Sequence, residues 1–255
     1  MPTTIIDLET KTGVCKTEIH TPSGPGPWPA VIVCFDAFGV RPAMSTIAER
    51  ISKMGYVVAV PDFYHDAGSV FELLPPGASH DVKGMMGLFA DQELRAKWSA
   101  KFYLPALDYD HLKNDVEPLL AYFAKRSDVK GGIGTTGYCM GGNMSVRIAA
   151  IFGDKIAATA SIHGGGLVTP APDSVHLRAA SIKSHVYIAA AMEDLTDETR
   201  KTLDDALTAA HVVHAIETYP AKHGFAVSDH GVYDEAAAER HYAALEKFYG
   251  ETLGK

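Results

Sequence analysis

From residue 30 onward, the sequence alternates short, continuously apolar runs with amphipathic segments of helical length. A strand that is apolar on both faces must be covered on both faces, which is typical of parallel strands joined by helices. The alternation therefore predicts an α/β fold, with a mostly parallel central sheet and helices on both of its faces. The apolar runs place the strands at 30–35, 56–60, 132–138, 157–162, 185–191 and 212–219.

The amphipathic segments between these strands are expected to form the crossover helices. Met44 and Ile47 fall on one helical face, and Pro42 suits the first turn of that helix. A second apolar stripe spans 112–123, but Pro118 lies within it, where a proline removes a backbone donor. We therefore expect the second helix to kink or to break at Pro118.

Signals near the two ends of the chain complete the predicted set of elements. Residues 1–28 indicate two short strands, the clearer one at 14–19, which are expected to form an antiparallel edge. Thr196 suits the N-cap of a third helix, and an apolar stripe from Ala238 predicts a last helix that ends at Gly250. The chain of 255 residues has no internal repeat and is expected to form a single domain.

Residues 64–107 fit neither the helical nor the strand period. They contain Pro75-Pro76-Gly77 and a Gly84-Met85-Met86-Gly87 cluster, and they follow a strand that should end near an active site. Long connections in compact domains are usually functional, so we expect this segment to cover the site in part. The alternative is a surface insertion with no part in the site.

Charge balance and cysteine content restrict the partners and the compartment. A formal net charge of −8 leaves no excess of basic residues to neutralise a phosphate backbone, so nucleic acid is not an expected partner. No stretch approaches the ~20 apolar residues of a membrane span and no basic, apolar leader is seen, so no membrane association is expected. Three cysteines do not make a disulfide framework and suit a reducing compartment. We therefore expect a cytoplasmic monomer or small homo-oligomer.

The most specific motif is Gly137-Tyr138-Cys139-Met140-Gly141, at the junction of an apolar strand and a helical segment. Small residues on both sides of a central side chain allow the sharp strand-to-helix turn, or elbow, that presents a nucleophile. The Cys139 sulfur would also lie at a helix N-terminus, where the helix dipole favours a thiolate. The alternative is that Cys139 is a small buried hydrophobic residue, which is the role we expect for Cys15 and Cys34.

Gly132, Gly134 and Gly137 also spell G-x-G-x-x-G, a motif that binds dinucleotides in other folds. In those folds the glycines follow a strand, and an acidic residue ends the next strand about 20 residues later. Here the glycines lie within the predicted strand, and the next strand ends at Ser161-Ile162-His163. The sequence therefore disfavours a nicotinamide site, and we expect no cofactor.

Two residues that follow later strands are suited to assist the Cys139 thiol. Asp194 comes after the run 185–191, and His223 comes after the run 212–219. Parallel strands end at one edge of the sheet, where hydrolases place a nucleophile, an acid and a histidine in this order. We expect His223 to take the thiol proton and Asp194 to orient its imidazole, with Glu193 as the fallback acid.

No metal site is expected from the spacing of potential ligands. His211 lies close to His214 and His80 adjoins Asp81, but neither pair has a companion pair at zinc-ligand spacing. In a chain with 12 histidines, such pairs are expected by chance on the surface.

Four segments taken together are similar to one protein family. They are Cys34-Phe35-Asp36-Ala37-Phe38-Gly39-Val40, Gly137-Tyr138-Cys139-Met140-Gly141-Gly142, Asp194 and His223-Gly224-Phe225. From about residue 30 to the C-terminus, the chain resembles the dienelactone hydrolase family. The resemblance implies an α/β-hydrolase fold, a triad of Cys139, His223 and Asp194, no cofactor, and hydrolysis of a cyclic enol ester. It further implies an oxyanion hole made by the backbone amides of Ala37 and Met140, and an acid, Asp36, that contacts the resting thiol.

Two departures from the family pattern concern the resting state and the substrate. The resting-state acid is typically glutamate, and Asp36 is one methylene shorter. Members that cleave dienelactone carry an arginine four residues after the histidine to bind the substrate carboxylate, and this chain has Val227 there. A neutral side chain cannot replace that bidentate clamp. Lys83, Arg95 or Lys97, in the segment expected to cover the site, could supply the positive charge.

Two functions from different classes remain open. The first is an ester or lactone hydrolase that acts through an acyl-thioenzyme at Cys139 and, because of Val227, accepts uncharged acyl groups. The second is a non-catalytic small-molecule-binding or thiol redox-responsive protein on the same fold. Turnover of a small activated ester that depends on Cys139 would separate the two.

Overall fold

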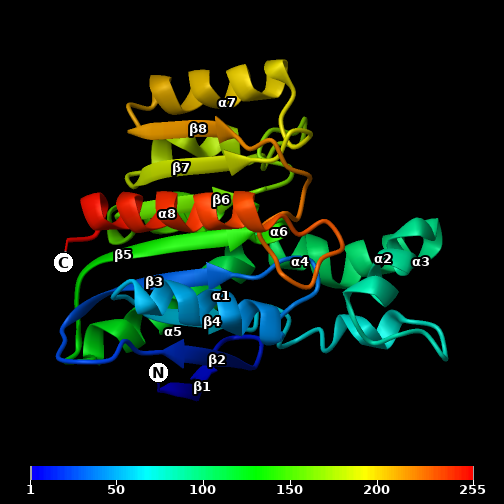
Figure 1. Cartoon of the computed structure of the whole chain (residues 1–255), viewed down its shortest axis with the longest axis horizontal. Coiled ribbons are helices and arrows are strands. Elements are labelled where there is room, and N and C mark those ends of the chain that lie inside the picture. Colours follow the sequence, from blue (N-terminus) through cyan, green and yellow to red (C-terminus); the bar gives the residue numbers. More distant parts are fainter. Residues whose placement is uncertain (1, 255) are drawn as a thin grey trace.

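Eight strands form the central sheet of the computed structural model, which describes residues 2–254. The strands are β1 (Thr3–Glu9), β2 (Val14–His20), β3 (Trp28–Cys34), β4 (Val57–Pro61), β5 (Val129–Tyr138), β6 (Ala158–Ile162), β7 (His185–Ala190) and β8 (His214–Thr218). Their order across the sheet is β1-β2-β4-β3-β5-β6-β7-β8 (Figure 1). All six predicted parallel strands are present, with ends that differ by a few residues.

The two kinds of strand in the sheet follow the two kinds of sequence pattern. Strands β3 to β8 pair in parallel, and every residue of β4 and of β6 is buried, as continuous apolar runs require. β1 pairs antiparallel with β2, and β2 pairs antiparallel with β4. β1 exposes most of its residues at the edge of the sheet. The predicted antiparallel N-terminal edge is therefore confirmed.

Helices cover both faces of the sheet, as predicted. They are α1 (Pro42–Lys53), α2 (Val82–Ala90), α3 (Gln92–Trp98), α4 (Leu104–Ala106), α5 (Tyr109–Lys125), α6 (Met140–Phe152), α7 (Asp197–Ala209) and α8 (Glu235–Thr252), with short helical turns at Val70–Leu73, Ser99–Tyr103, Gly153–Lys155 and Val175–Ser181. Helices α1 and α8 lie on one face and α5 and α6 on the other (Figure 1). Thr196 caps α7 by accepting a hydrogen bond from the amide of Thr199, and α8 continues past its expected end at Gly250. Within residues 2–254, no helix is both long enough and apolar enough to cross a membrane.

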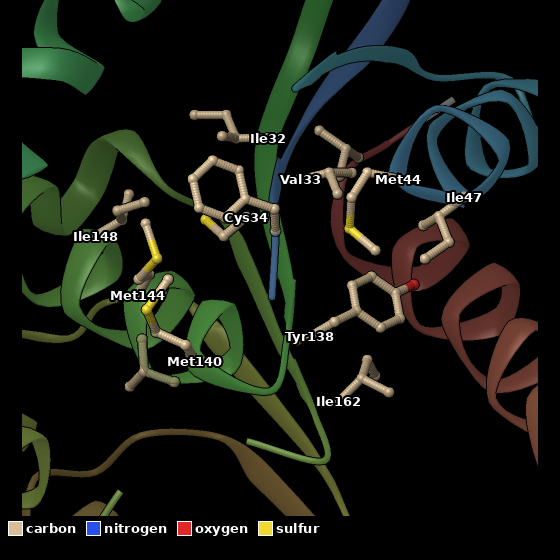
Figure 2. Close-up of a cluster of buried hydrophobic side chains, with 14 of the residues drawn as sticks. Ile32, Val33, Cys34, Met44, Ile47, Tyr138, Met140, Met144, Ile148 and Ile162 are labelled. Atoms are coloured by element: carbon tan, nitrogen blue, oxygen red, sulfur yellow. The ribbon is translucent and has the colours of Figure 1, made fainter. Parts of the chain in front are cut away.

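Strand β3 lies between two helices at the centre of the core. Figure 2 shows Met144 and Ile148 of α6 on one side of β3 and Met44 and Ile47 of α1 on the other. All four side chains are buried. Burial of each such side chain contributes roughly 1.5–3 kcal/mol. This packing holds α1 and α6 against β3, and it thereby fixes the position at which β3 and the neighbouring strands end.

A break at Pro118, one of the two outcomes expected there, does not occur. Helix α5 continues through Pro118 without interruption. The proline lacks one backbone donor, but this loss is one hydrogen bond in a helix of 17 residues. Leu112, Val116 and Phe123 are buried on the inner face of α5, on both sides of the proline. Their packing outweighs the missing bond.

Segment 64–107 contains regular helices, although its sequence shows no clear period. Asp81 caps α2 by accepting a hydrogen bond from the amide of Gly84, and Asp91 caps α3 by accepting from that of Leu94. Helices of this length are too short for an apolar stripe to be recognised. Figure 1 shows α2 and α3 projecting beyond the ends toward which the parallel strands point.

Candidate active site

Cys139 occupies a sharp turn between β5, which ends at Tyr138, and α6, which begins at Met140. Its backbone has a φ of 56° and a ψ of −118°, a strained conformation for a residue other than glycine. A Cβ on Gly137 would lie 1.8 Å from the carbonyl oxygen of Gly141, so glycine is required there. Cys139 is half-buried and lines a cavity, and its side chain therefore does not point into the core.

His223 and Asp194 form a short hydrogen bond beside this turn. The imidazole Nδ1 lies 2.6 Å from Oδ1 of Asp194, and the other carboxylate oxygen accepts from the amide of Ala191 at 2.7 Å. The Asp194 side chain is 3% exposed, whereas that of His223 is 33% exposed. With Nδ1 bound to the carboxylate, the Nε2 atom of His223 is the one available to the thiol.

The thiol of Cys139 and the carboxylate of Asp194 together determine the protonation of His223. Burial disfavours the charged imidazolium, but hydrogen bonds to Asp194 and Cys139, with the negative charges of both, outweigh burial and raise the pKa of His223 to about 10. The structure thus brings Cys139, His223 and Asp194 together, as their order along the strands predicts. The arrangement favours the imidazolium form of His223.

Glu193, the fallback acid, does not contact the imidazole ring. Its side chain is exposed, and its Oε1 accepts a hydrogen bond of 3.4 Å from the backbone amide of His223. Asp194 is therefore the acid that orients the ring, and Glu193 contacts only the backbone of the loop.

Ala37 and Met140, whose amides are the expected oxyanion donors, belong to the loop after β3 and to the first turn of α6. Ala37 lines the same cavity as Cys139, and Met140 directly follows the cysteine. In the described part of the chain, neither amide takes part in a turn or loop hydrogen bond. The carbonyl of Ala37 accepts from Tyr64 Oη at 3.4 Å and from Trp98 Nε1 at 3.3 Å, which fixes the peptide between Ala37 and Phe38. Both amides are thus available to an oxyanion.

Asp36 does not have the partner that the family resemblance implies. Among residues 2–254, its buried carboxylate is hydrogen-bonded to Arg41 at 2.6 and 2.8 Å, to His230 Nε2 at 3.0 Å and to the amide of Phe38 at 3.0 Å, and not to the Cys139 thiol. Burial alone would raise the pKa of Asp36, but the hydrogen bond from His230 and the charge of Arg41 lower it to about 2. The shorter acid is therefore held by a guanidinium and an imidazole, and it joins the loop after β3 to the loop after β8.

The cavity beside Cys139 has a volume of about 590 Å³ and a mostly apolar wall. Segment 64–107 supplies Val82, Met86, Phe89, Arg95 and Trp98 to this wall. Phe38 and Val232 also line the cavity, and its other polar side chains are Glu193, Lys222, His223 and His230. We call this space the Cys139 cavity.

His163 is a neighbour of Cys139 that the sequence analysis overlooked. The amide of Cys139 donates to Nδ1 of His163 at 3.0 Å, and the rings of His163 and His223 have centroids 5.2 Å apart. Burial, and then the nearby charge of His223, hold the pKa of His163 well below its usual value, so the ring is neutral. His163 directly follows β6, the strand beside β5, and this adjacency was the signal that could have identified it.

The histidine pairs weighed as metal ligands stay apart from any larger set of ligands. Among the described residues, neither His211 with His214 nor His80 with Asp81 belongs to a group of three potential ligand atoms. One such group does exist, in a region that the sequence spacing did not indicate, and it consists of His65, His111 and Asp115.

A strand, a nucleophile turn and a helix, with a histidine and an acid on loops after later parallel strands, define an α/β-hydrolase. The model of the dienelactone hydrolase family matches residues 15–253, and the chain belongs to this family of hydrolases. A putative carboxymethylenebutenolidase of Synechocystis sp. is 28% identical over 257 residues, which cover 98% of this chain and 97% of the relative.

Solved structures agree with this fold. A putative dienelactone hydrolase from Klebsiella pneumoniae has a TM-score of 0.78 at 21% identity, with 98% of each chain covered. A dienelactone hydrolase-like promiscuous phosphotriesterase from metagenomic libraries has a TM-score of 0.71 at 22% identity, with 100% of each chain covered. At these identities the likeness concerns the fold.

Proposed function

We propose that this hydrolase cleaves a carboxylic ester or lactone through an acyl-thioenzyme, with Cys139 as the nucleophile. His223 acts as the acid and base, and Asp194 orients its imidazole. The observation that carries the proposal is the chain of contacts from Asp194 through His223 to Cys139 at the strained turn. A nucleophile, a base and an orienting group in hydrogen-bond contact are the arrangement that covalent catalysis requires.

The acylation step follows from this geometry. The Cys139 thiolate attacks the carbonyl carbon, a carbon–sulfur bond forms, and the carbonyl electron pair moves to the oxygen. The amides of Ala37 and Met140 stabilise that oxyanion, a contribution that is typically worth about 2.7–4 kcal/mol per donor. When the oxyanion collapses, the ester carbon–oxygen bond breaks and the leaving alkoxide takes the proton from His223 Nε2.

Hydrolysis of the acyl-thioenzyme uses the same groups in reverse. His223, now neutral, accepts a proton from a water molecule as the water oxygen attacks the thioester carbonyl. A second oxyanion forms at the same amides and collapses with loss of the Cys139 thiolate. The carboxylic acid leaves, and the thiolate and the imidazolium of His223 are restored. Asp194 stabilises the imidazolium in both steps.

The cavity wall supports an acyl group that is largely apolar. Phe38, Phe89 and Trp98 face the space beside Cys139. Val227, which stands where dienelactone-cleaving members have an arginine, is buried in the core and does not line the cavity. Uncharged esters are therefore expected substrates. The name carboxymethylenebutenolidase, which the Synechocystis relative carries, supports a lactone as the natural one.

One cation of segment 64–107 is placed to meet a substrate carboxylate. Arg95 lines the Cys139 cavity, whereas Lys97 is paired with Glu93 and Lys83 lines other hollows. Lys222, from the loop that precedes His223, also lines the cavity. We propose that Arg95 supplies the positive charge that Val227 cannot.

The decisive experiment compares wild type with Cys139→Ala in hydrolysis of 4-nitrophenyl acetate. We expect kcat to fall by roughly 10⁴-fold or more while the circular dichroism spectrum stays unchanged. Cys15→Ala is the matched control, because Cys15 is fully buried in β2 and does not line the Cys139 cavity.

Mass spectrometry of the wild type during turnover provides the second arm. An acetyl group on the peptide that contains Cys139 is expected, and it should be absent from the variant. Undiminished turnover by Cys139→Ala would reject the proposal. Binding of esters without any turnover by the wild type would favour the non-catalytic alternative.

A further inference from the structure

A second cluster of ionisable side chains lies between the turn after β4 and helix α5. His65 follows β4, and His111 and Asp115 are one helical turn apart on α5. His65 Nε2 lies 3.2 Å from Oδ1 of Asp115, and His111 Nε2 lies 3.1 Å from Oδ2. The three potential ligand atoms are all within 4.8 Å of one another.

The cluster is buried and has an excess of negative charge. The side chains of Asp115, His65 and His111 are 0%, 2% and 10% exposed. Among the ion pairs of residues 2–254, no lysine or arginine reaches Asp115. Asp66 adds a second carboxylate, with Oδ2 3.8 Å from His111 Nδ1. A buried carboxylate requires a compensating positive charge, and the side chains that pair with Asp115 are the two histidines.

One oxygen of Asp115 is directed into the cluster without a hydrogen bond. Oδ2 is fully buried and has no hydrogen-bond partner, although His111 Nε2 is only 3.1 Å away. The imidazole nitrogen and the carboxylate oxygen therefore converge without a well-aligned proton between them. Two ligand atoms that each lie ~2.0–2.1 Å from a tetrahedral ion are about 3.3 Å apart. The separations of 3.1 Å between His111 Nε2 and Oδ2 and of 3.2 Å between His65 Nε2 and Oδ1 are each close to that spacing, with one carboxylate oxygen facing each imidazole.

Groups around the cluster are suited to orient its members. Asn114 Nδ2 donates to Oδ1 of Asp115 at 3.2 Å, and the carboxylate of Asp66 faces the distal nitrogen of His111. Carboxylates and amides in these positions hold metal-binding histidines and acids in other proteins. His111 Nε2 also lies 3.3 Å from the carbonyl oxygen of Phe63, so binding of a metal would displace a proton from that contact.

We infer that His65, His111 and Asp115 bind one divalent transition-metal ion. Two imidazoles and one carboxylate suit Zn²⁺ or Co²⁺, and they leave a coordination position for water. The surface hollow lined by His111, Asn114 and Thr12 gives access from solvent. Because the ligands come from the turn after β4 and from α5, the bound ion would fasten these two elements together. The inference is independent of the proposed hydrolysis at Cys139.

The experiment is a titration of Zn²⁺ into the full chain that carries Cys139→Ala, monitored by isothermal titration calorimetry. This variant is the parent for the comparisons below. This background removes the thiolate, which with His223 could itself bind Zn²⁺. We expect one equivalent of Zn²⁺ to bind. We also expect the thermal midpoint to rise by roughly 5 °C when free Zn²⁺ is about 100-fold above its dissociation constant.

Variants of the cluster then locate the ion. His65→Gln and Asp115→Asn each remove a ligand atom with little change of volume, and we expect Zn²⁺ affinity to fall about 100-fold or more. Asp66→Asn alters only the group behind His111, and we expect a decrease of about 10-fold. His185→Gln, at an exposed position on β7, is the matched control and should bind as tightly as the parent.

Co²⁺ supplies a readout that does not depend on stability. A tetrahedral Co²⁺ site with nitrogen and oxygen ligands should give visible d–d absorption without the thiolate charge-transfer band. The absence of stoichiometric binding by the parent, or equal affinity in parent, His65→Gln and Asp66→Asn, would overturn the inference. Binding that occurs only when Cys139 is present would also overturn it. If His65→Gln or Asp115→Asn does not fold, Asp66→Asn still tests the inference, because Asp66 is more exposed than the two ligands.

Discussion

The two walls of the Cys139 cavity differ in how tightly their backbones are constrained. At the nucleophile turn, a Cβ on Gly141 would lie 2.3 Å from the carbonyl oxygens of Cys34 and Phe35, so strand and helix approach as closely as backbones allow. In α2 of segment 64–107, a Cβ on Gly87 would meet nothing within 4 Å. The turn tolerates no added atom at Gly141, whereas α2 has room for one at Gly87.

This difference suggests that the turn positions the reacting groups, whereas segment 64–107 contacts the substrate. The tightly packed turn holds Cys139 beside His223, and catalysis depends on positions held to within a fraction of an ångström. The facing wall presents apolar and cationic side chains such as Met86 and Arg95, and Met86 is 55% exposed. We expect substitutions at the turn to change kcat, and those in segment 64–107 to change substrate selection or the stability of that segment.

The largest effect is expected for Asp194→Asn. An amide cannot hold His223 with Nδ1 protonated, and kcat should fall by about 10⁴-fold. The charge and hydrogen bond of Asp194 help to raise the pKa of His223 to about 10. Activity needs the imidazolium to protonate the leaving group, so it should decline as the pH rises through that value. In the variant, this alkaline limb should move to lower pH.

The pH dependence of kcat and kcat/KM for an alkyl ester, whose alkoxide leaving group requires that proton, measures both changes. Glu193→Gln is the matched control, because it alters the exposed neighbouring acid, which contacts only the backbone of His223. A similar loss in both variants would mean that charge near the loop, rather than orientation of the ring, is what matters.

The next largest effect is expected at His163, whose imidazole accepts a hydrogen bond from the backbone amide of Cys139. His163→Leu removes the acceptor that the Cys139 amide has at 3.0 Å, although the amide retains the carbonyl of Ile162 at 3.1 Å. We expect kcat/KM to fall by about 10-fold, which corresponds to roughly 1.4 kcal/mol for a weakened hydrogen bond. His163→Asn keeps an acceptor near the Nδ1 position and should recover most of the loss.

Steady-state kinetics and the rate of Cys139 alkylation by iodoacetamide test this effect together. If the Leu and Asn variants at position 163 have equal kcat/KM and equal alkylation rates, the imidazole only fills space and the prediction is wrong. If Asn recovers kcat/KM and the alkylation rate in parallel, the acceptor positions the turn.

The residues found from the sequence and those missed differ in what determines their position. Cys139, Asp194 and His223 follow parallel strands, and the carboxyl ends of such strands meet at one edge, so the order along the chain was enough to bring them together. His163 and the partners of Asp36 depend instead on contacts across the fold. His230 is 194 residues from Asp36, and no local pattern reports such a contact.

The same distinction explains the elements that were predicted incompletely. Strands buried on both faces leave a continuous apolar run, and all of them were found. Helices α2 and α3 follow the N-cap residues Asp81 and Asp91, whose capping hydrogen bonds determine the start of a short helix more than any apolar stripe does. At Pro118, a proline rule was outweighed by buried packing along α5. Local rules therefore failed where tertiary contacts decide.

A smaller effect is expected for Arg95→Gln, on the loosely packed wall. Loss of the guanidinium should raise KM about 10-fold for esters that carry a distal carboxylate, because one charge-assisted contact is lost. The constants for uncharged esters should be unchanged. Lys97→Gln is the matched control in the same helix, since Lys97 pairs with Glu93 and does not line the cavity. An equal change for both classes of ester would show that Arg95 shapes the wall and does not recognise charge.

The smallest effect is expected for Gly87→Ala, and it tests how loosely the second wall is packed. Alanine is favoured over glycine within a helix by roughly 0.5–1 kcal/mol. With open space around the added methyl group, the free energy of unfolding, measured by denaturant titration, should rise by about that amount. The kcat for 4-nitrophenyl acetate should not change, because the nucleophile turn is not altered.

Gly84, in the same helix, supplies the control of opposite sign. A Cβ on Gly84 would lie 1.9 Å from the carbonyl oxygen of Ser79, so Gly84→Ala should destabilise the segment by ~1–3 kcal/mol. Limited proteolysis reports the segment separately from the sheet, and cleavage within 64–107 should slow in Gly87→Ala and accelerate in Gly84→Ala. If both variants unfold with the whole molecule and show equal proteolysis, segment 64–107 is as firmly bound to the core as the turn at Cys139, and the contrast between the two walls does not hold.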